Sequence, residues 1–158
     1  MQLKSSPEDF IVEEINLMKF TPEGKFSYYL LKKRDLETGA AVQQIADRWK
    51  INQKYINIAG NKDKIAVTTQ YISISQGPEQ DMKSDNLELK FLGKGSFSLQ
   101  LGYLEGNKFT IVVRQISSTE MKHFLQHTKS IPPFINYYDD QRFGINKNNH
   151  LIGKYLVK

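Results

Sequence analysis

Alternating apolar and polar residues predict strands in the first part of the chain. Residues 10–15 alternate in this way and follow a Ser-Ser-Pro turn, so we expect a short edge strand there. Residues 26–33, rich in aromatic residues and leucine, follow the turn at 21–24 and predict a longer strand. We expect these two strands to pair with each other.

A helix with one buried face is predicted next, over residues 38–50. Apolar residues recur there at helical spacing, and Thr38 is a candidate N-cap. The residues of the apolar face are Val42, Ile45, Ala46 and Trp49.

Two further β-rich segments, 55–59 and 67–75, flank the polar loop 60–64. Catalytic groups concentrate on loops that a rigid sheet supports. This loop, which contains Asp63, is therefore the place where we expect chemistry.

The second half of the chain predicts three strands and one helix. Residues 76–86 form a turn-rich connector, and strands are expected at 87–92, 97–104 and 108–116. Ser117 and Glu120 have capping-box spacing, which predicts a helix that Pro132-Pro133 would end. Its apolar stripe is Met121, Phe124, Leu125 and Thr128. The order of elements favours an α+β fold with helices on one face of a sheet.

Composition narrows the class of protein. A chain of 158 residues with 39% hydrophobic and 25% charged residues is typical of one globular domain. The net charge of +5 permits an RNA partner, but the charges are scattered, so charge alone equally fits a solvated surface. The absence of cysteine excludes disulfides, thiolate metal sites and a cysteine nucleophile. With neither a signal peptide nor a long apolar run, we expect a cytoplasmic protein without a membrane partner.

A zinc site is not expected. His123 and His127 have a spacing that zinc sites use, but no third ligand of suitable type is close in the sequence. An exposed helix face explains the pair better.

Four segments resemble motifs of the TruD family of tRNA pseudouridine synthases, in the order in which that family has them. They are Pro7–Glu14 (PEDFIVEE), Ala59–Gln70 (AGNKDKIAVTTQ), Gly106–Ile111 (GNKFTI) and Asn136–Gly144 (NYYDDQRFG). The second is the most specific, because it resembles the segment that carries the family's catalytic aspartate. Four matches in order are not readily explained by chance.

The resemblance implies a pseudouridine-synthase-like sheet, mixed and mostly antiparallel, and isomerisation of a tRNA uridine, U13 in the family. It implies that Asp63 is the catalytic carboxylate and that neither a metal nor a cofactor is used. A carboxylate suits a reaction on a base held out of its stack. The basic side chain of Lys62 or Lys64 would favour its ionised form.

The resemblance also implies substrate contacts from Phe10, Asn107 and Phe109, whose aromatic rings could stack on a flipped uracil. By composition alone the two phenylalanines are more often core residues, and the asparagine more often belongs to a turn.

We expect Glu14, Lys62 and Arg142 to be supporting residues. For Glu14 and Arg142, an internal ion pair or a backbone contact is an equally good interpretation.

Members of this family are roughly twice as long as this chain, with an inserted domain and a closing C-terminal motif that residues 1–158 do not contain. We therefore expect residues 1–158 to be the N-terminal portion of a catalytic domain, inactive alone, whose open sheet edges favour self-association. The alternative function is a non-catalytic RNA-binding module.

Overall fold

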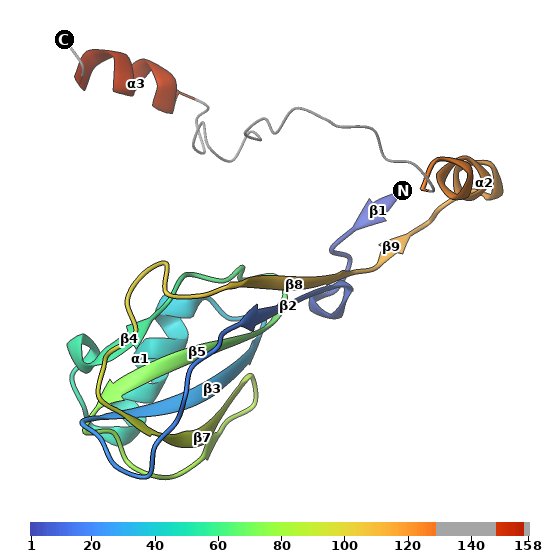
Figure 1. Cartoon of the computed structure of the whole chain (residues 1–158). Coiled ribbons are helices and arrows are strands. Elements are labelled where there is room, and N and C mark those ends of the chain that lie inside the picture. Colours follow the sequence, from blue (N-terminus) through green and yellow to red (C-terminus); the bar gives the residue numbers. More distant parts are fainter. Residues whose placement is uncertain (129–147, 157–158) are drawn as a thin grey trace. The chain divides into compact units, whose positions relative to one another are not determined.

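The computed structural model describes residues 1–128 and 148–156, in two compact units, Met1–Ser117 and Ser118–Lys158. Figure 1 shows the elements along the chain. Those of the first unit are β1 (Gln2–Leu3), the 3-10 helix η1 (Pro7–Asp9), β2 (Phe10–Ile15), β3 (Phe26–Arg34), α1 (Thr38–Trp49), the 3-10 helix η2 (Gln53–Tyr55), β4 (Ile56–Ile58), β5 (Val67–Ser75), β6 (Met82–Lys83), β7 (Leu87–Gly95), β8 (Gly106–Ile111) and β9 (Val113–Arg114).

One mixed sheet forms the body of the first unit. Its strand order is β6-β7-β3-β5-β2-β8, and β4 also pairs with β5. Only the contact between β2 and β5 is parallel, while every other pair in this sheet is antiparallel. Helix α1 packs against one face of the sheet (Figure 1), where Ile45 lies in one core with Tyr29 and Ile72. The predicted α+β class and the mostly antiparallel sheet are confirmed.

Several strand boundaries are confirmed and one pairing is wrong. The strands predicted at 10–15, 26–33 and 67–75 are β2, β3 and β5. However, β2 and β3 do not pair, because β5 lies between them and β7 occupies the other edge of β3. The strand at 10–15 is also not an edge strand, because β2 lies between β5 and β8. Alternation along a strand predicts its faces but not its neighbours.

The strand predicted at 97–104 is wrong, because residues 96–105 form an irregular loop. Leu99 is buried and its N–H donates to the Ser73 hydroxyl, whereas Phe97 and Tyr103 are exposed. Gly102 adopts φ +86°, in the left-handed region that a strand does not use. The last predicted strand, 108–116, is divided into β8 and β9.

The predicted helix over 38–50 is confirmed as α1, but Thr38 is not its N-cap. Glu37 is the N-cap residue and Thr38 is the first helical residue, so its hydroxyl is free to bond elsewhere. Lys50 ends the helix in the left-handed conformation, at φ 54°. Residues 76–86, predicted as a connector, contain the short strand β6.

The second unit contains α2 (Ser118–His127) and α3 (Asn149–Leu156). The helix predicted after Ser117 is thus confirmed, although Met121, Phe124 and Leu125 on its apolar stripe are exposed. Pro132-Pro133 and the fourth motif, Asn136–Gly144, lie outside the described residues. Within the described ranges, no helix combines the length and the apolar character needed to cross a membrane.

Candidate active site

The loop that carries Asp63 leaves the sheet where one edge of β5 changes partner. Strand β2 pairs with residues 67–69 of β5, and β4 pairs with residues 72–74 of the same edge. Between them, the N–H of Tyr71 donates to the Glu14 carboxylate over 3.3 Å, so a side chain fills the gap in the ladder. The loop after β4 therefore passes beside a charged group of β2.

Glu14 and Lys62 form a buried ion pair at this gap. The Lys62 Nζ lies 2.8 Å from Glu14 Oε2, and the two side chains are 6% and 0% exposed. Removing two charges from water is costly unless each finds a partner, and here the carboxylate accepts from both the ammonium and a backbone N–H. This pair fastens the loop to β2.

Three more buried side chains hold the loop from the face that α1 covers. The Thr38 hydroxyl accepts from the Lys62 N–H over 3.0 Å, and Gln70 Nε2 donates to the Gly60 carbonyl over 3.2 Å. Lys33 Nζ donates to the Asp63 carbonyl over 2.8 Å. Backbone groups of residues 60, 62 and 63 are thus satisfied by side chains instead of by a strand ladder.

The Asp63 side chain is 47% exposed. Its Oδ2 lies 2.8 Å from Lys4 Nζ, and the same ammonium lies 3.8 Å from the centre of the Phe10 ring. Lys4 therefore places the carboxylate next to an aromatic face through an ion pair and a cation–π contact.

Phe10, Phe109 and Asn107 share one face of the sheet. Phe10 and Glu14 lie on one face of β2 because alternate residues do so, and Phe109 and Asn107 stand opposite Val12 and Glu14. The rings of Phe10 and Phe109 are 6.0 Å apart between centroids.

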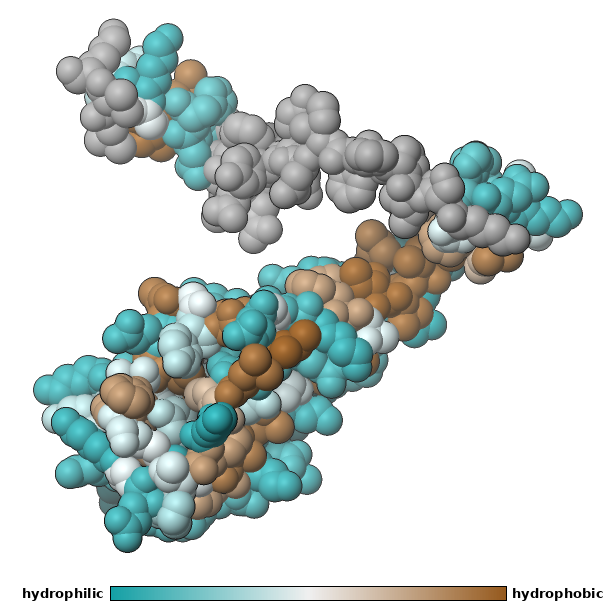
Figure 2. Space-filling model, in the orientation of Figure 1, coloured by the Kyte–Doolittle hydropathy of each residue, from teal (hydrophilic) through white to brown (hydrophobic). Residues whose placement is uncertain are grey.

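This part of the surface is apolar and open in the described chain. Phe109 is 55% exposed, and Figure 2 shows hydrophobic residues gathered over β8, β9 and β1. The exposed residues are Leu3, Phe109, Ile111 and Val112. An exposed aromatic ring is suited to stacking with a planar base.

The N-terminal segment that carries Lys4 is fixed by strand β9. Gln2 pairs with Arg114 and Leu3 with Val113 in a short antiparallel ladder. The Arg114 guanidinium also donates two hydrogen bonds, of 2.8 and 2.7 Å, to the buried carboxylate of Asp9. The Arg114 guanidinium holds the pKa of Asp9 below its usual value, and Asp9 in turn accepts the Ser6 N–H.

Comparison with known proteins identifies the family. The family model described as tRNA pseudouridine synthase D (TruD) matches residues 1–158. The chain belongs to the TruD family.

Relatives with this description are similar along the whole chain. It is 39% identical to tRNA pseudouridine synthase D of Aquifex aeolicus and 41% identical to the probable tRNA pseudouridine synthase D of Thermococcus onnurineus, over 100% and 99% of its length. It covers 43% and 39% of those proteins.

A solved structure of a TruD relative has a similar fold. The crystal structure of the putative tRNA pseudouridine synthase D (TruD) from Methanosarcina mazei superposes with a TM-score of 0.84 at 37% identity, covering 99% of this chain and 38% of that one. The chain thus spans about two fifths of the length of these TruD relatives.

The TruD motifs that were distant in sequence meet in the structure. The first, second and third motifs contribute β2, the loop 60–64 and β8 to one region. Lys62 pairs with Glu14 rather than with Asp63, so the basic neighbour expected for Asp63 is instead Lys4. Arg142 lies outside the described residues.

Sequence reasoning missed Lys4 and Lys33. Lys4 lies before the first TruD motif and Lys33 lies inside a strand, and neither stands near Asp63 in the sequence. Thr38 was noticed only as a possible helix cap.

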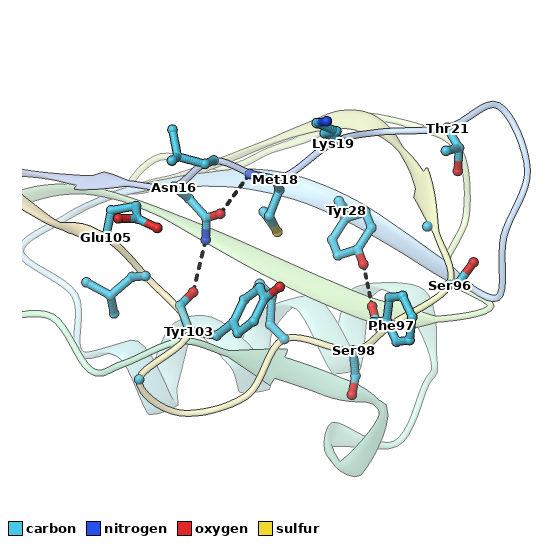
Figure 3. Close-up of a pocket in the computed structure, with 15 residues that line it drawn as sticks. Asn16, Met18, Lys19, Thr21, Tyr28, Ser96, Phe97, Ser98, Tyr103 and Glu105 are labelled. Atoms are coloured by element: carbon cyan, nitrogen blue, oxygen red, sulfur yellow. Dashed lines mark hydrogen bonds between the residues drawn. The ribbon is translucent and has the colours of Figure 1, made fainter.

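A hollow of about 560 Å³ lies elsewhere on the first unit and contains none of the predicted site residues (Figure 3). It is lined by the loops 16–21 and 95–105, where Asn16 Nδ2 donates to the Tyr103 carbonyl. Among the described residues, no group of three or more His, Cys, Asp or Glu side chains is placed to hold a metal ion.

Proposed function

We propose that the protein containing this chain isomerises a uridine of tRNA to pseudouridine, with Asp63 as the catalytic carboxylate. One observation carries the proposal. In a chain of the TruD family, the Asp63 carboxylate is held by Lys4 beside the Phe10 ring, on a loop that buried side chains fasten. The relatives are named tRNA pseudouridine synthase D, which supports tRNA as the substrate. The family resemblance indicates U13 as the position.

The reaction is an isomerisation and is balanced without a co-reactant. The N1–C1′ bond breaks, the uracil rotates, a C5–C1′ bond forms, and the proton of C5 is lost while N1 gains one. Asp63 could add to the base, add to the sugar, or remove a ribose proton to give a glycal. All three routes require an ionised carboxylate within reach of a flipped nucleotide.

Phe10 and Phe109 are proposed to stack against that nucleotide. Their rings share one face of the sheet with Asn107, whose side chain is exposed and able to bond a base edge or the sugar-phosphate backbone. Glu14 and Lys62 have a supporting role, because their buried ion pair holds the loop rather than the substrate.

The test is pseudouridine mapping on a U13-containing tRNA. It uses the complete natural protein that contains residues 1–158, called below the complete protein, and its Asp63→Asn variant. Asp85→Asn is a matched control, because Asp85 is also an exposed aspartate in a loop. We expect the complete protein and the control to convert the uridine and Asp63→Asn to convert none. Equal conversion by Asp63→Asn would refute the role of Asp63.

We also propose that residues 1–158 alone do not turn over, since they cover only about two fifths of the TruD relatives. The same assay on this chain, beside the Aquifex aeolicus enzyme as a positive control, checks this. Conversion by the chain alone would contradict it.

A second candidate is a non-catalytic RNA-binding module. The exposed aromatic Phe109 and the net charge of +5 favour it. The two functions differ in their response to Asp63→Asn, because an enzyme loses turnover while it keeps tRNA binding. A complete protein that binds tRNA but never forms pseudouridine would support the binding module.

A further inference from the structure

Lys33 is a buried lysine directly behind the candidate catalytic loop. It is 1% exposed and lies on β3, opposite Thr68 of β5, on the face that α1 covers. Its Nζ donates to the carbonyls of Leu36 over 2.6 Å and Asp63 over 2.8 Å, and to that of Lys62 over 3.4 Å. Three carbonyl oxygens thus match the three protons of an ammonium group.

Burying such a lysine in the core lowers the free energy of unfolding. Among the described residues, no carboxylate forms a salt bridge with Lys33. A buried charge without a carboxylate disfavours the folded state, and an apolar side chain would pack at this place without that cost. However, it would leave the carbonyl of Asp63 without the donor that it has here, whereas the carbonyl of Lys62 would still accept from the Thr38 hydroxyl.

The loop's other anchors bind groups other than the Asp63 carbonyl, and Thr38 shares the Lys62 carbonyl with Lys33. Gln70 holds the carbonyl of Gly60, Thr38 holds the N–H of Lys62, and Glu14 holds the Lys62 side chain. Among the described hydrogen bonds, only Lys33 donates to the peptide carbonyl of Asp63, and Lys4 donates to its carboxylate. One lysine therefore fixes the backbone and another fixes the side chain of the same residue.

We propose that Lys33 is a positioning residue for the reaction, whose ammonium ties the peptide of Asp63 to the segment that begins α1 and so sets where the Asp63 carboxylate points. This proposal rests on the function proposed above. Lys33 is buried and contacts the backbone of the loop, whereas Phe109, a proposed substrate contact, is 55% exposed. Its loss should therefore lower kcat and leave KM nearly unchanged.

The charge of Lys33 adds a pH dependence. The surroundings of Lys33 lower its pKa from the ordinary 10.5 to about 8, because burial lowers it most, Asp63 and Glu37 oppose the shift, and Lys62 adds to it. Its register partner on β5, Thr68, is uncharged. Below pH 8 the ammonium offers three donors, and above it the amine offers two and no charge. We expect kcat to decline above about pH 8 in the complete protein, and this decline to be absent in Lys33→Met.

The decisive variant is Lys33→Met in the complete protein, measured by single- and multiple-turnover tRNA conversion. Displacing a reacting group by about 1 Å can cost on the order of 100-fold, so we expect kcat to fall by about 10- to 100-fold and KM to stay within about twofold. Lys32→Met is the matched control, because Lys32 is the exposed neighbour on the same strand. Ile45→Val, on the buried face of α1, controls for a general loss of stability.

Hydrogen–deuterium exchange gives a readout that does not need turnover. We expect faster exchange over residues 60–66 in Lys33→Met and unchanged exchange in Lys32→Met. If Lys33→Met does not fold, Lys33→Gln, which keeps two donors, takes its place with a smaller expected change. The proposal is overturned if exchange over residues 60–66 is unchanged, or if kcat falls no more than in Ile45→Val. If wild type converts no uridine while exchange responds as expected, the proposed function fails and the anchoring of the loop stands.

Discussion

Lys4 Nζ lies 2.8 Å from Asp63 Oδ2, although 59 positions separate the two residues in the sequence. The contact depends on β1, which pairs with β9 and brings the N-terminal segment over the loop that follows β4. The candidate active site is therefore assembled from the N-terminal segment, β2, β8 and the loop 60–64, none of which forms it alone.

Replacing Lys4 with Met should slow the reaction without unfolding the protein. The side chains of Lys4 and Asp63 are 39% and 47% exposed, so water partly screens their attraction. An exposed ion pair contributes at most about 1 kcal/mol, which corresponds to roughly a fivefold change in rate. We expect about this loss in the complete protein, measured as single-turnover conversion of tRNA. Lys64→Met, which removes an exposed charge next to Asp63, is the control and should keep its rate.

The buried pair of Glu14 and Lys62 should show strong coupling. Lys62→Met leaves a buried carboxylate without its cation, which should cost about 3–5 kcal/mol of the free energy of unfolding. The double variant Glu14→Gln/Lys62→Met removes both charges and should be more stable than Lys62→Met alone. Urea denaturation of wild type, Lys62→Met, Glu14→Gln and the double variant measures the coupling. Additive losses would show that the ion pair is not a unit.

The contact between Asp9 and Arg114 predicts a loss of stability in acid. Because Arg114 lowers the pKa of folded Asp9 below its ordinary value of 3.8, the stabilisation is fully present above that pH and is lost as the pH falls below it. Arg114→Gln should therefore lower Tm at neutral pH and flatten its acid dependence.

Thermal melts between neutral pH and pH 2 check this. Lys108→Gln is the control, since Lys108 pairs with the exposed Glu13 and its loss should leave the acid dependence of Tm nearly unchanged. Parallel curves for wild type and Arg114→Gln would contradict the role of Arg114.

Replacing Gly77 or Gly39 with alanine should change the stability of the protein in opposite directions. A Cβ at Gly77 would lie 2.6 Å from Tyr29 Oη and 2.8 Å from Ile74 Cβ, so Gly77→Ala should cost about 1–3 kcal/mol by overpacking. At Gly39, in α1, a Cβ would meet nothing within 4 Å. Gly39→Ala should raise stability by up to about 1 kcal/mol, because alanine is the better helix former. Denaturant titration of the two variants should give opposite signs.

Strand β8 should drive self-association of residues 1–158. It is the last strand of the sheet in the described part of the chain, and Phe109 and Ile111 on it are exposed. An unpaired edge with apolar side chains templates pairing with another chain. We expect a concentration-dependent dimer by light scattering, weakened by Ile111→Lys and unchanged by Leu17→Lys, which alters an exposed leucine outside the strands. A monomer at high protein concentration would contradict this prediction.

The sequence by itself determined most of the local elements and supplied the main candidates for the site residues. Alternation in residues 10–15 and 67–75 and helical spacing in 38–50 were sufficient, because these patterns report which side of a local element is buried. The motif around Asp63 could be recognised because its residues are adjacent in the chain. The prediction of a strand at 97–104 was wrong because a loop with a single buried residue, such as Leu99, can show the same alternation of apolar and polar residues as a strand.

Only the tertiary structure decided which strands are neighbours and what surrounds Asp63. The parallel pairing of β2 with β5, the placement of β8 beside β2 and the ladder of β1 with β9 all join segments far apart in the chain. Lys33 and Lys4 have no local pattern that marks them, since a lysine in a strand or near a terminus is usually solvated. Their roles arise because long-range packing buries one ammonium behind the Asp63 peptide and brings the other to the Asp63 carboxylate.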